Sequence, residues 1–139
     1  IMDMHKGMAE TVAAHMPTVE QIAACSWLNE AELTVYNDAF SHTAFQGALQ
    51  WYRCVAEPRF NAELQNFSGC TIDVPSCFIA GLQDWGVHQI TGAFENMLSK
   101  ACPNMQGVHL VEHAGHWVQQ EQPAATTSLL LAFIQRINR

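Results

Sequence analysis

The sequence contains little charge and no cluster of basic residues. Charged residues are 14% of its 139 positions, the formal net charge is −7, and only six residues are lysine or arginine. Proteins that bind nucleic acids through their phosphates need a basic patch, so we expect no nucleic-acid partner. The acidity is ordinary for a soluble cytosolic enzyme, and we expect a cytoplasmic protein.

Long apolar runs and paired cysteines are also missing. No apolar run reaches the ~18 residues that a membrane-spanning helix needs, and the N-terminus does not have the layout of a signal peptide. The five cysteines are odd in number and include no Cys-x-x-Cys pair, which argues against a disulfide framework or a zinc ribbon. We therefore expect no membrane span and reduced, buried thiols. The cysteines are Cys25, Cys54, Cys70, Cys77 and Cys102.

Apolar residues are abundant enough for a packed core. Hydrophobic residues make up 49% of the chain, which is typical of globular rather than disordered proteins. The sequence begins with Ile1 rather than with methionine, so we expect either a processed chain or a piece of a longer protein.

The first half of the chain has the pattern of successive helices. We expect helices over residues 8–15, 18–25, 30–40 and 45–56. Thr18 and Gln21 have the spacing of a capping box, and Asn29 is suited to cap the third helix. A loop is expected over residues 41–43, and Pro58 is expected to end the fourth helix.

The second half alternates between strands and helices. The expected order is a strand over residues 74–81, a helix over 93–101, a strand over 107–111 and a helix over 123–137. This alternation is the pattern of parallel α/β units. Two parallel strands alone form a poor core, because parallel sheets normally bury both faces. We therefore expect them to belong to a larger sheet whose other strands precede Ile1.

An acid and a histidine follow the two expected strands. Asp84 comes after the first strand and His116 after the second. Catalytic groups of open α/β sheets lie beyond the carboxyl ends of the strands, so these two side chains should meet. A histidine that acts as a general base needs a carboxylate on one ring nitrogen, and Asp84 can supply it to His116. Gly81 and Gly115 suit tight turns that lift the two side chains out of the sheet.

Simpler interpretations of these residues stay open. Asp84 also fits the role of an ordinary turn residue. His116 also fits that of a core histidine whose ring nitrogens are hydrogen-bonded within the protein. His109, His113 and His116 have spacings that would converge on a helix, but this segment has the pattern of strand and loop, so we expect no metal. We also expect no cofactor. Three tryptophans are expected to form the walls of a substrate pocket or to pack in the interior: Trp51, Trp85 and Trp117.

Three segments of the sequence have motifs that are typical of a known fold. Residues 114–123, Ala-Gly-His-Trp-Val-Gln-Gln-Glu-Gln-Pro, look like the histidine loop of epoxide hydrolases. Residues 45–53, Phe-Gln-Gly-Ala-Leu-Gln-Trp-Tyr-Arg, resemble the cap-domain helix of the same enzymes, and residues 78–84, Phe-Ile-Ala-Gly-x-x-Asp, resemble the acid loop of α/β-hydrolases. The resemblance implies an α/β fold class: the C-terminal part of an α/β-hydrolase, with parallel strands and flanking helices, preceded by helical cap segments. It places a cap (lid) portion at residues 1–65 and a core portion at residues 66–139.

The resemblance also implies hydrolysis of a small apolar epoxide to a vicinal diol. In that reaction an upstream aspartate attacks an epoxide carbon, and Tyr52, with a second cap tyrosine, protonates the opening oxygen. His116, oriented by Asp84, then activates the water that hydrolyses the ester intermediate. The family's nucleophile elbow and oxyanion loop are not in the sequence. Residues 83–86, Gln-Asp-Trp-Gly, superficially resemble the elbow, but they lie after the cap motif, where the acid belongs.

Other functions of the same fold stay open. A haloalkane or haloacid dehalogenase uses the same aspartate–histidine–acid logic, and an ester hydrolase would need a serine nucleophile. Tyr52 favours the epoxide, because an alkoxide needs a proton and a departing halide does not, although Tyr52 also fits simple helix packing. The chain alone is alternatively an inert remnant, or a half that works only with an N-terminal complementing chain. An exposed apolar sheet edge would favour self-association, so a homo-oligomer is a further expectation.

Overall fold

The structure is a computed structural model that describes residues 10, 13 and 15–139. Its contacts divide the chain into two compact units, Ile1–Asn37 and Asp38–Arg139. The helix expected over residues 8–15 lies mostly outside the described residues. In the part of the chain that the structure describes, no helix is both long enough and apolar enough to cross a membrane.

Helix α2 (Val19–Ala24) begins with the expected capping box. The Thr18 hydroxyl accepts the backbone N–H of Gln21 at 3.2 Å, and the Gln21 side-chain oxygen accepts the backbone N–H of Thr18 at 2.8 Å. Two N–H groups at the start of the helix are thereby satisfied without tertiary contacts, which explains why so short a helix is recognisable from its sequence.

Helix α3 (Glu30–Thr43) starts where expected but ends later. The Asn29 side chain accepts two backbone N–H groups of the first turn, at 3.0 and 3.1 Å, so the predicted cap is confirmed. The loop expected over residues 41–43 is wrong, because these residues form the last turn of the helix. Two of their side chains hydrogen-bond to carbonyls one turn earlier, and the helix ends only where Ala44 adopts a φ of 51°.

Helices α4 (Gln46–Ala56) and α5 (Pro58–Gln65) follow each other closely. The helix expected over residues 45–56 is confirmed, but α5 was not predicted. Glu57 is extended between the two helices, and Pro58 begins α5 as well as following the end of α4. Proline suits the first turn of a helix because that turn needs no N–H from it and its φ is already helical.

Strands β1 (Ser76–Gly81) and β2 (Met105–Val111) form a two-stranded parallel sheet. Both strands lie where the sequence predicts them, although β2 starts earlier than expected. The last residues in register are Gly81 and Val111. Because the strands are parallel and end at the same pair, the loops that follow them leave the sheet side by side.

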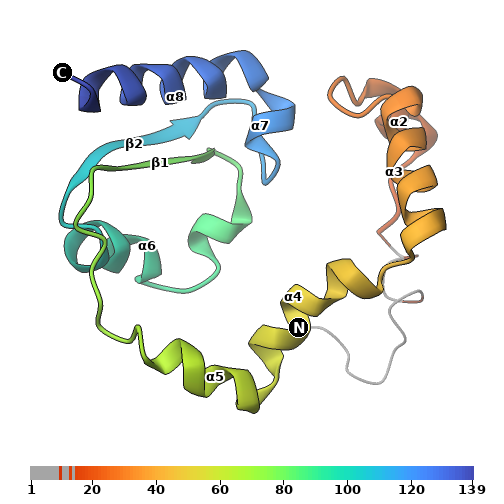
Figure 1. The fold of residues 1–139 in the computed structure, drawn as a ribbon. Coiled ribbons are helices and arrows are strands. Elements are labelled where there is room, and N and C mark those ends of the chain that lie inside the picture. The colour runs from red at the N-terminus through yellow and green to blue at the C-terminus, as the bar shows by residue number, and fades with distance from the viewer. Residues whose placement is uncertain (1–9, 11–12, 14) are drawn as a thin grey trace. The chain divides into compact units, whose positions relative to one another are not determined.

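Helices pack on both sides of the two strands (Figure 1). Helix α8 (Pro123–Ile137) has the predicted bounds and lies along one side. Helix α6 (Ala93–Asn96) lies on the other side, where the ring of Phe94 packs 5.3 Å from the ring of Phe78 in β1. The helix expected at this point continues after α6 as a π-helical turn, Met97–Ala101.

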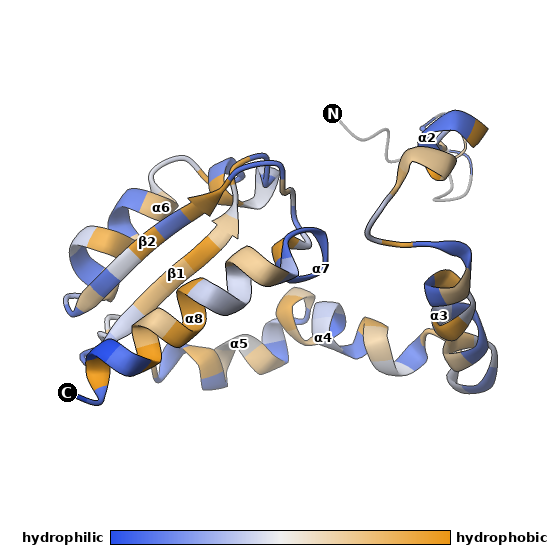
Figure 2. Ribbon diagram, turned by 90° about the horizontal axis from the view of Figure 1, so that it is seen from above, coloured by the Kyte–Doolittle hydropathy of each residue, from blue (hydrophilic) through white to orange (hydrophobic). Residues whose placement is uncertain are grey.

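The interior around the sheet is small. Val108 and Leu110 of β2 are exposed. Figure 2 shows that β1 is mostly apolar, whereas β2 mixes apolar and polar residues. Parallel sheets normally bury both faces, so this surface is suited to packing against further structure, as expected for part of a larger sheet. The buried apolar residues among those described are Ala80, Cys102, Ala114 and Val118.

Candidate active site

The carboxyl ends of β1 and β2 bring an aspartate and a histidine together. The loop after β1 carries Asp84, and the loop after β2 carries His116. Oδ1 of Asp84 lies 2.9 Å from Nδ1 of His116, although the two residues are 32 positions apart in sequence. The structure thus joins the two residues that the sequence singled out. Their catalytic roles stay predictions.

The two loops touch each other backbone to backbone. Gln83 donates its backbone N–H to the carbonyl of Ala114 at 3.0 Å. A Cβ atom added to Gly81 would lie 2.2 Å from the carbonyl oxygens of both Ala114 and Gly115. Glycine is therefore required at position 81 by the close approach of the loops rather than by the tight turn that we expected. This contact fixes the separation of the loops and hence that of Asp84 and His116.

Asp84 is held as a hydrogen-bond acceptor. Its side chain is only 12% exposed, and it caps a 3₁₀ turn, Trp85–His88, by accepting the backbone N–H of Gly86 at 2.8 Å. Burial is the largest influence on the pKa of Asp84 and raises it. Hydrogen bonds from His116 and Gly86, together with the charges of His116 and His88, outweigh burial and lower the pKa below its usual value. The carboxyl is therefore ionised at neutral pH.

An ionised Asp84 determines which ring nitrogen of His116 carries hydrogen. A carboxylate can only accept hydrogen bonds, so the neutral imidazole donates from Nδ1 and keeps its lone pair on Nε2. The His116 side chain is 48% exposed. This arrangement leaves Nε2 as a base, and the adjacent carboxylate stabilises the imidazolium that forms when Nε2 takes a proton.

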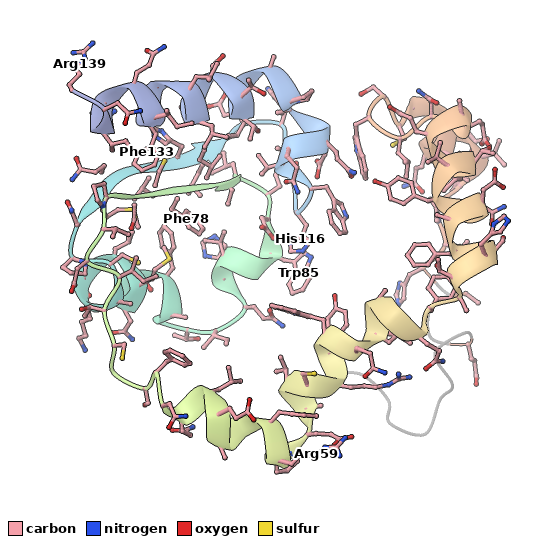
Figure 3. All side chains as sticks on the ribbon, viewed as in Figure 1. Arg59, Phe78, Trp85, His116, Phe133 and Arg139 are labelled. Carbon is pink, nitrogen blue, oxygen red and sulfur yellow. The ribbon has the colours of Figure 1, made fainter. Side chains whose placement is uncertain are left out.

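Two of the three predicted pocket tryptophans surround the imidazole. The ring of Trp85 stacks on His116 with centroids 5.4 Å apart and an interplanar angle of 22° (Figure 3). Trp117 meets the same ring edge-on at 5.3 Å and 74°. Such contacts restrict the orientation of the histidine ring. Whether these tryptophans also line a substrate pocket stays a prediction.

Tyr52 and Trp51 are placed differently. Both lie on α4 and are largely exposed, Tyr52 to 70%. Among the described residues, no hydrogen bond or ring contact joins either of them to Asp84 or His116. Their roles in proton donation and in the pocket stay predictions.

The histidines that we considered as metal ligands lie in different structural elements. His109 lies within β2, and His113 occupies a left-handed conformation with a φ of 56° at the start of the histidine loop. Within the described ranges, no three His, Cys, Asp or Glu side chains gather in a way that could hold a metal ion.

One residue of the site was not singled out from the sequence. Glu121, the last residue of the one-turn helix α7 (Val118–Glu121), folds back over the histidine loop. Its Oε2 accepts the backbone N–H of Gly115 at 2.7 Å, and its Oε1 accepts that of Trp117 at 2.9 Å. The available signal was its position four residues after Trp117, one helical turn away, which lets a glutamate reach back to the start of its own turn.

Comparison with known proteins identifies relatives of this chain. None of the known protein-family models matches it. Epoxide hydrolase B of Mycobacterium tuberculosis is 34% identical over 113 residues, which are 78% of this chain and 30% of that protein. Epoxide hydrolase A of the same organism is 34% identical over 112 residues, 78% of this chain and 32% of that protein.

Solved structures give the same result. Potato (Solanum tuberosum) epoxide hydrolase I superposes with a TM-score of 0.72 at 32% identity, over 87% of this chain and 41% of that chain. An epoxide hydrolase from an endophytic Streptomyces superposes with a TM-score of 0.81 at 31% identity, over 91% of this chain and 37% of that chain.

These likenesses define the fold first and the family second. The parallel strands, their flanking helices and the paired loops are part of an α/β-hydrolase fold, as the sequence predicted. Within that fold the chain is homologous to the epoxide hydrolases, and it spans about a third of the length of the curated relatives that it matches. The resemblance drawn from the histidine loop and the acid loop is thereby confirmed.

Proposed function

We propose that these 139 residues supply the histidine and acid of an epoxide hydrolase that converts small apolar epoxides to vicinal diols. The observation that carries the proposal is the 2.9 Å contact between Asp84 and His116 at the strand ends of a chain whose relatives are epoxide hydrolases. A histidine held at Nδ1 by an ionised carboxylate is suited to take a proton from water.

The reaction needs a nucleophile from outside these residues, because the sequence has no Gly-x-Asp-x-Gly or Gly-x-Ser-x-Gly segment. A carboxylate oxygen of that nucleophile attacks an epoxide carbon, the C–O bond of the ring breaks, and Tyr52 donates a proton to the released alkoxide. Nε2 of His116 then takes a proton from water, and the resulting hydroxide adds to the ester carbonyl. The alkoxide expelled from that carbonyl takes the proton back from His116 and leaves as the diol, and the proton on the regenerated carboxyl of the nucleophile returns to the Tyr52 phenolate through solvent. Asp84 stabilises the imidazolium while it exists.

The proposal extends to the organisation of the whole protein. Residues 1–65 act as a cap portion that brings Tyr52 to the substrate, and residues 66–139 act as the catalytic core portion. The complementing N-terminal segment or chain packs on the sheet, with exposed Val108 and Leu110 as part of the contact. Without it, this apolar surface favours a homo-oligomer. The five cysteines are free thiols, which supports a cytoplasmic location. The expectation that they are buried holds only for Cys102, because Cys54 and Cys70 are exposed.

The test is an assay with styrene oxide. The purified 139-residue chain is expected to form no diol alone, and to form it after co-expression with the remaining N-terminal part of Mycobacterium tuberculosis epoxide hydrolase B. The matched variant His116→Gln in the same complex should accumulate the covalent ester, seen as added substrate mass on the N-terminal part. Turnover by the chain alone, or a complex that forms neither diol nor ester, would overturn the proposal.

The same complex separates the rival reactions. Tyr52→Phe should reduce diol formation without preventing release of chloride from a chloroalkane, because only the alkoxide needs a proton. Conversely, hydrolysis of a p-nitrophenyl ester with no reaction on styrene oxide would identify an ester hydrolase.

A further inference from the structure

The histidine loop carries two backbone N–H groups that need a partner, one on each side of His116. Gly115 is half-buried and follows the buried residue Ala114. Trp117 is the N-cap of helix α7, so its carbonyl accepts helical hydrogen bonds but its N–H has no acceptor within the helix. Leaving the part-buried N–H of Gly115 without an acceptor costs free energy comparable to a lost hydrogen bond, whereas the N–H of Trp117 is exposed and can exchange its protein acceptor for water. The loop geometry therefore depends on what accepts these two groups.

Both N–H groups are accepted by a single carboxylate. Glu121 binds Gly115 through Oε2 at 2.7 Å and Trp117 through Oε1 at 2.9 Å. The fit is close, because a Cβ added to Gly115 would lie 3.3 Å from Oε1 of Glu121. Hydrogen bonds from neutral N–H groups to a charged oxygen are shorter and stronger than those between neutral groups. The two backbone amides that flank His116 are thus held by the same carboxylate.

The remainder of the loop is anchored at its carbonyls. The Ala114 carbonyl accepts the backbone N–H of Gln83 at 3.0 Å, and the His113 carbonyl accepts the side-chain amide of Gln122 at 3.3 Å. His113 itself has a φ of 56°, a left-handed conformation that is uncommon for a non-glycine residue. With these anchors and Glu121 in place, the backbone on both sides of His116 is fixed.

We propose that Glu121 is a positioning residue: it holds the backbone around His116 so that Nδ1 points at Asp84. This inference deepens the proposed function, on which it rests for the role of His116 as the base. Among the described residues, Glu121 forms no hydrogen bond or ion pair with the imidazole or with Asp84, so its effect passes through the loop. Two acceptor oxygens are required, which glutamate supplies, glutamine supplies in part, and alanine does not.

The experiment uses nuclear magnetic resonance on the 139-residue chain with ¹⁵N-labelled histidine and backbone. Three signals are followed: the Nδ1–H proton of His116 and the exchange rates of the Gly115 and Trp117 amides. Glu121→Ala is expected to abolish or shift the Nδ1–H signal and to raise both exchange rates about tenfold or more, since a charge-assisted hydrogen bond is lost. Glu112→Gln removes the same charge from an exposed position nearby and is expected to leave all three signals unchanged.

Glu121→Gln keeps the shape and one acceptor oxygen. It is expected to remain folded, to lose protection at one of the two amides, and to give a smaller change in the Nδ1–H signal. If Glu121→Ala fails to fold, the signals of Glu121→Gln decide whether the inference holds. An unchanged Nδ1–H signal in a folded Glu121 variant whose amides have lost protection would show that the glutamate is structural only and would overturn the inference. None of these signals depends on epoxide turnover, so failure of the proposed function leaves the result interpretable.

Discussion

The edge of the sheet and the helices α4 and α5 are held together in different ways. At the edge, hydrogen bonds join loops far apart in sequence: Asp84 to His116, and Gln83 to Ala114. In α4 and α5 the hydrogen bonds are local, and large apolar side chains such as Trp51 are exposed. Hydrogen bonds between the two loops that carry Asp84 and His116 position this pair. The hydrogen bonds of α4 are internal to the helix, so a catalytic role for α4 depends on contacts with segments outside it.

The largest effect is expected where the two loops touch. Gly81→Ala would place a Cβ 2.2 Å from two carbonyl oxygens of the opposite loop, and backbone atoms cannot move aside cheaply. We expect the free energy of unfolding to fall by about 3 kcal/mol or more. Thermal or denaturant unfolding of the 139-residue chain, followed by circular dichroism, measures this.

The matched control is a glycine in α4. A Cβ added to Gly47 meets nothing within 4 Å, and alanine favours the helix, so Gly47→Ala should be neutral or stabilise by about 0.5 kcal/mol. Equal losses for the two substitutions would mean that the loops are not held as tightly as their separation indicates.

A smaller effect is expected from the acid itself, and it depends on pH. Because the pKa of Asp84 is lowered in the folded chain, its ionised form stabilises the fold at pH values above the ordinary carboxyl pKa. That stabilisation is lost as the pH falls through the lower, folded-state pKa. Asp84→Asn should therefore cost about 2 kcal/mol at neutral pH, and the difference from the wild type should shrink in acid.

The exposed Asp38 in α3 provides the comparison for charge alone. Asp38→Asn removes the same formal charge, and its unfolding curve should follow the wild type at every pH. A difference between wild type and Asp84→Asn that stays constant down to the acid limit would contradict the lowered pKa.

Local chemistry explains most of what could be predicted from the sequence. The capping residues Thr18 and Asn29 act within one turn, and the meeting of Asp84 with His116 follows from two parallel strands that end together. Pro58 was predicted only to end α4, and the prediction missed α5. A proline that follows one helix can also begin the next, as Pro58 does here.

What could not be predicted depends on distances between separate segments. The requirement for Gly81 arises from carbonyls of the opposite loop, and no local pattern in the sequence specifies how closely two loops approach. Glu121 lies within a recognisable motif, yet its function as an acceptor for two amides appears only when the loop is folded. Tertiary contacts of this kind determine the geometry of the site.

The smallest expected effect compares two tryptophans. Trp85 stacks on His116, so Trp85→Leu should lower the free energy of unfolding by about 1 kcal/mol and remove the ring-current shift from the His116 Cε1–H proton signal. Trp51 on α4 is 75% exposed, so Trp51→Leu should change stability by less than about 0.5 kcal/mol and leave the His116 signal in place. If both variants moved the His116 signal, α4 would have to pack against the site, and the contrast between the two regions would no longer hold. If neither moved it, the stacking of Trp85 on the imidazole would not persist in solution.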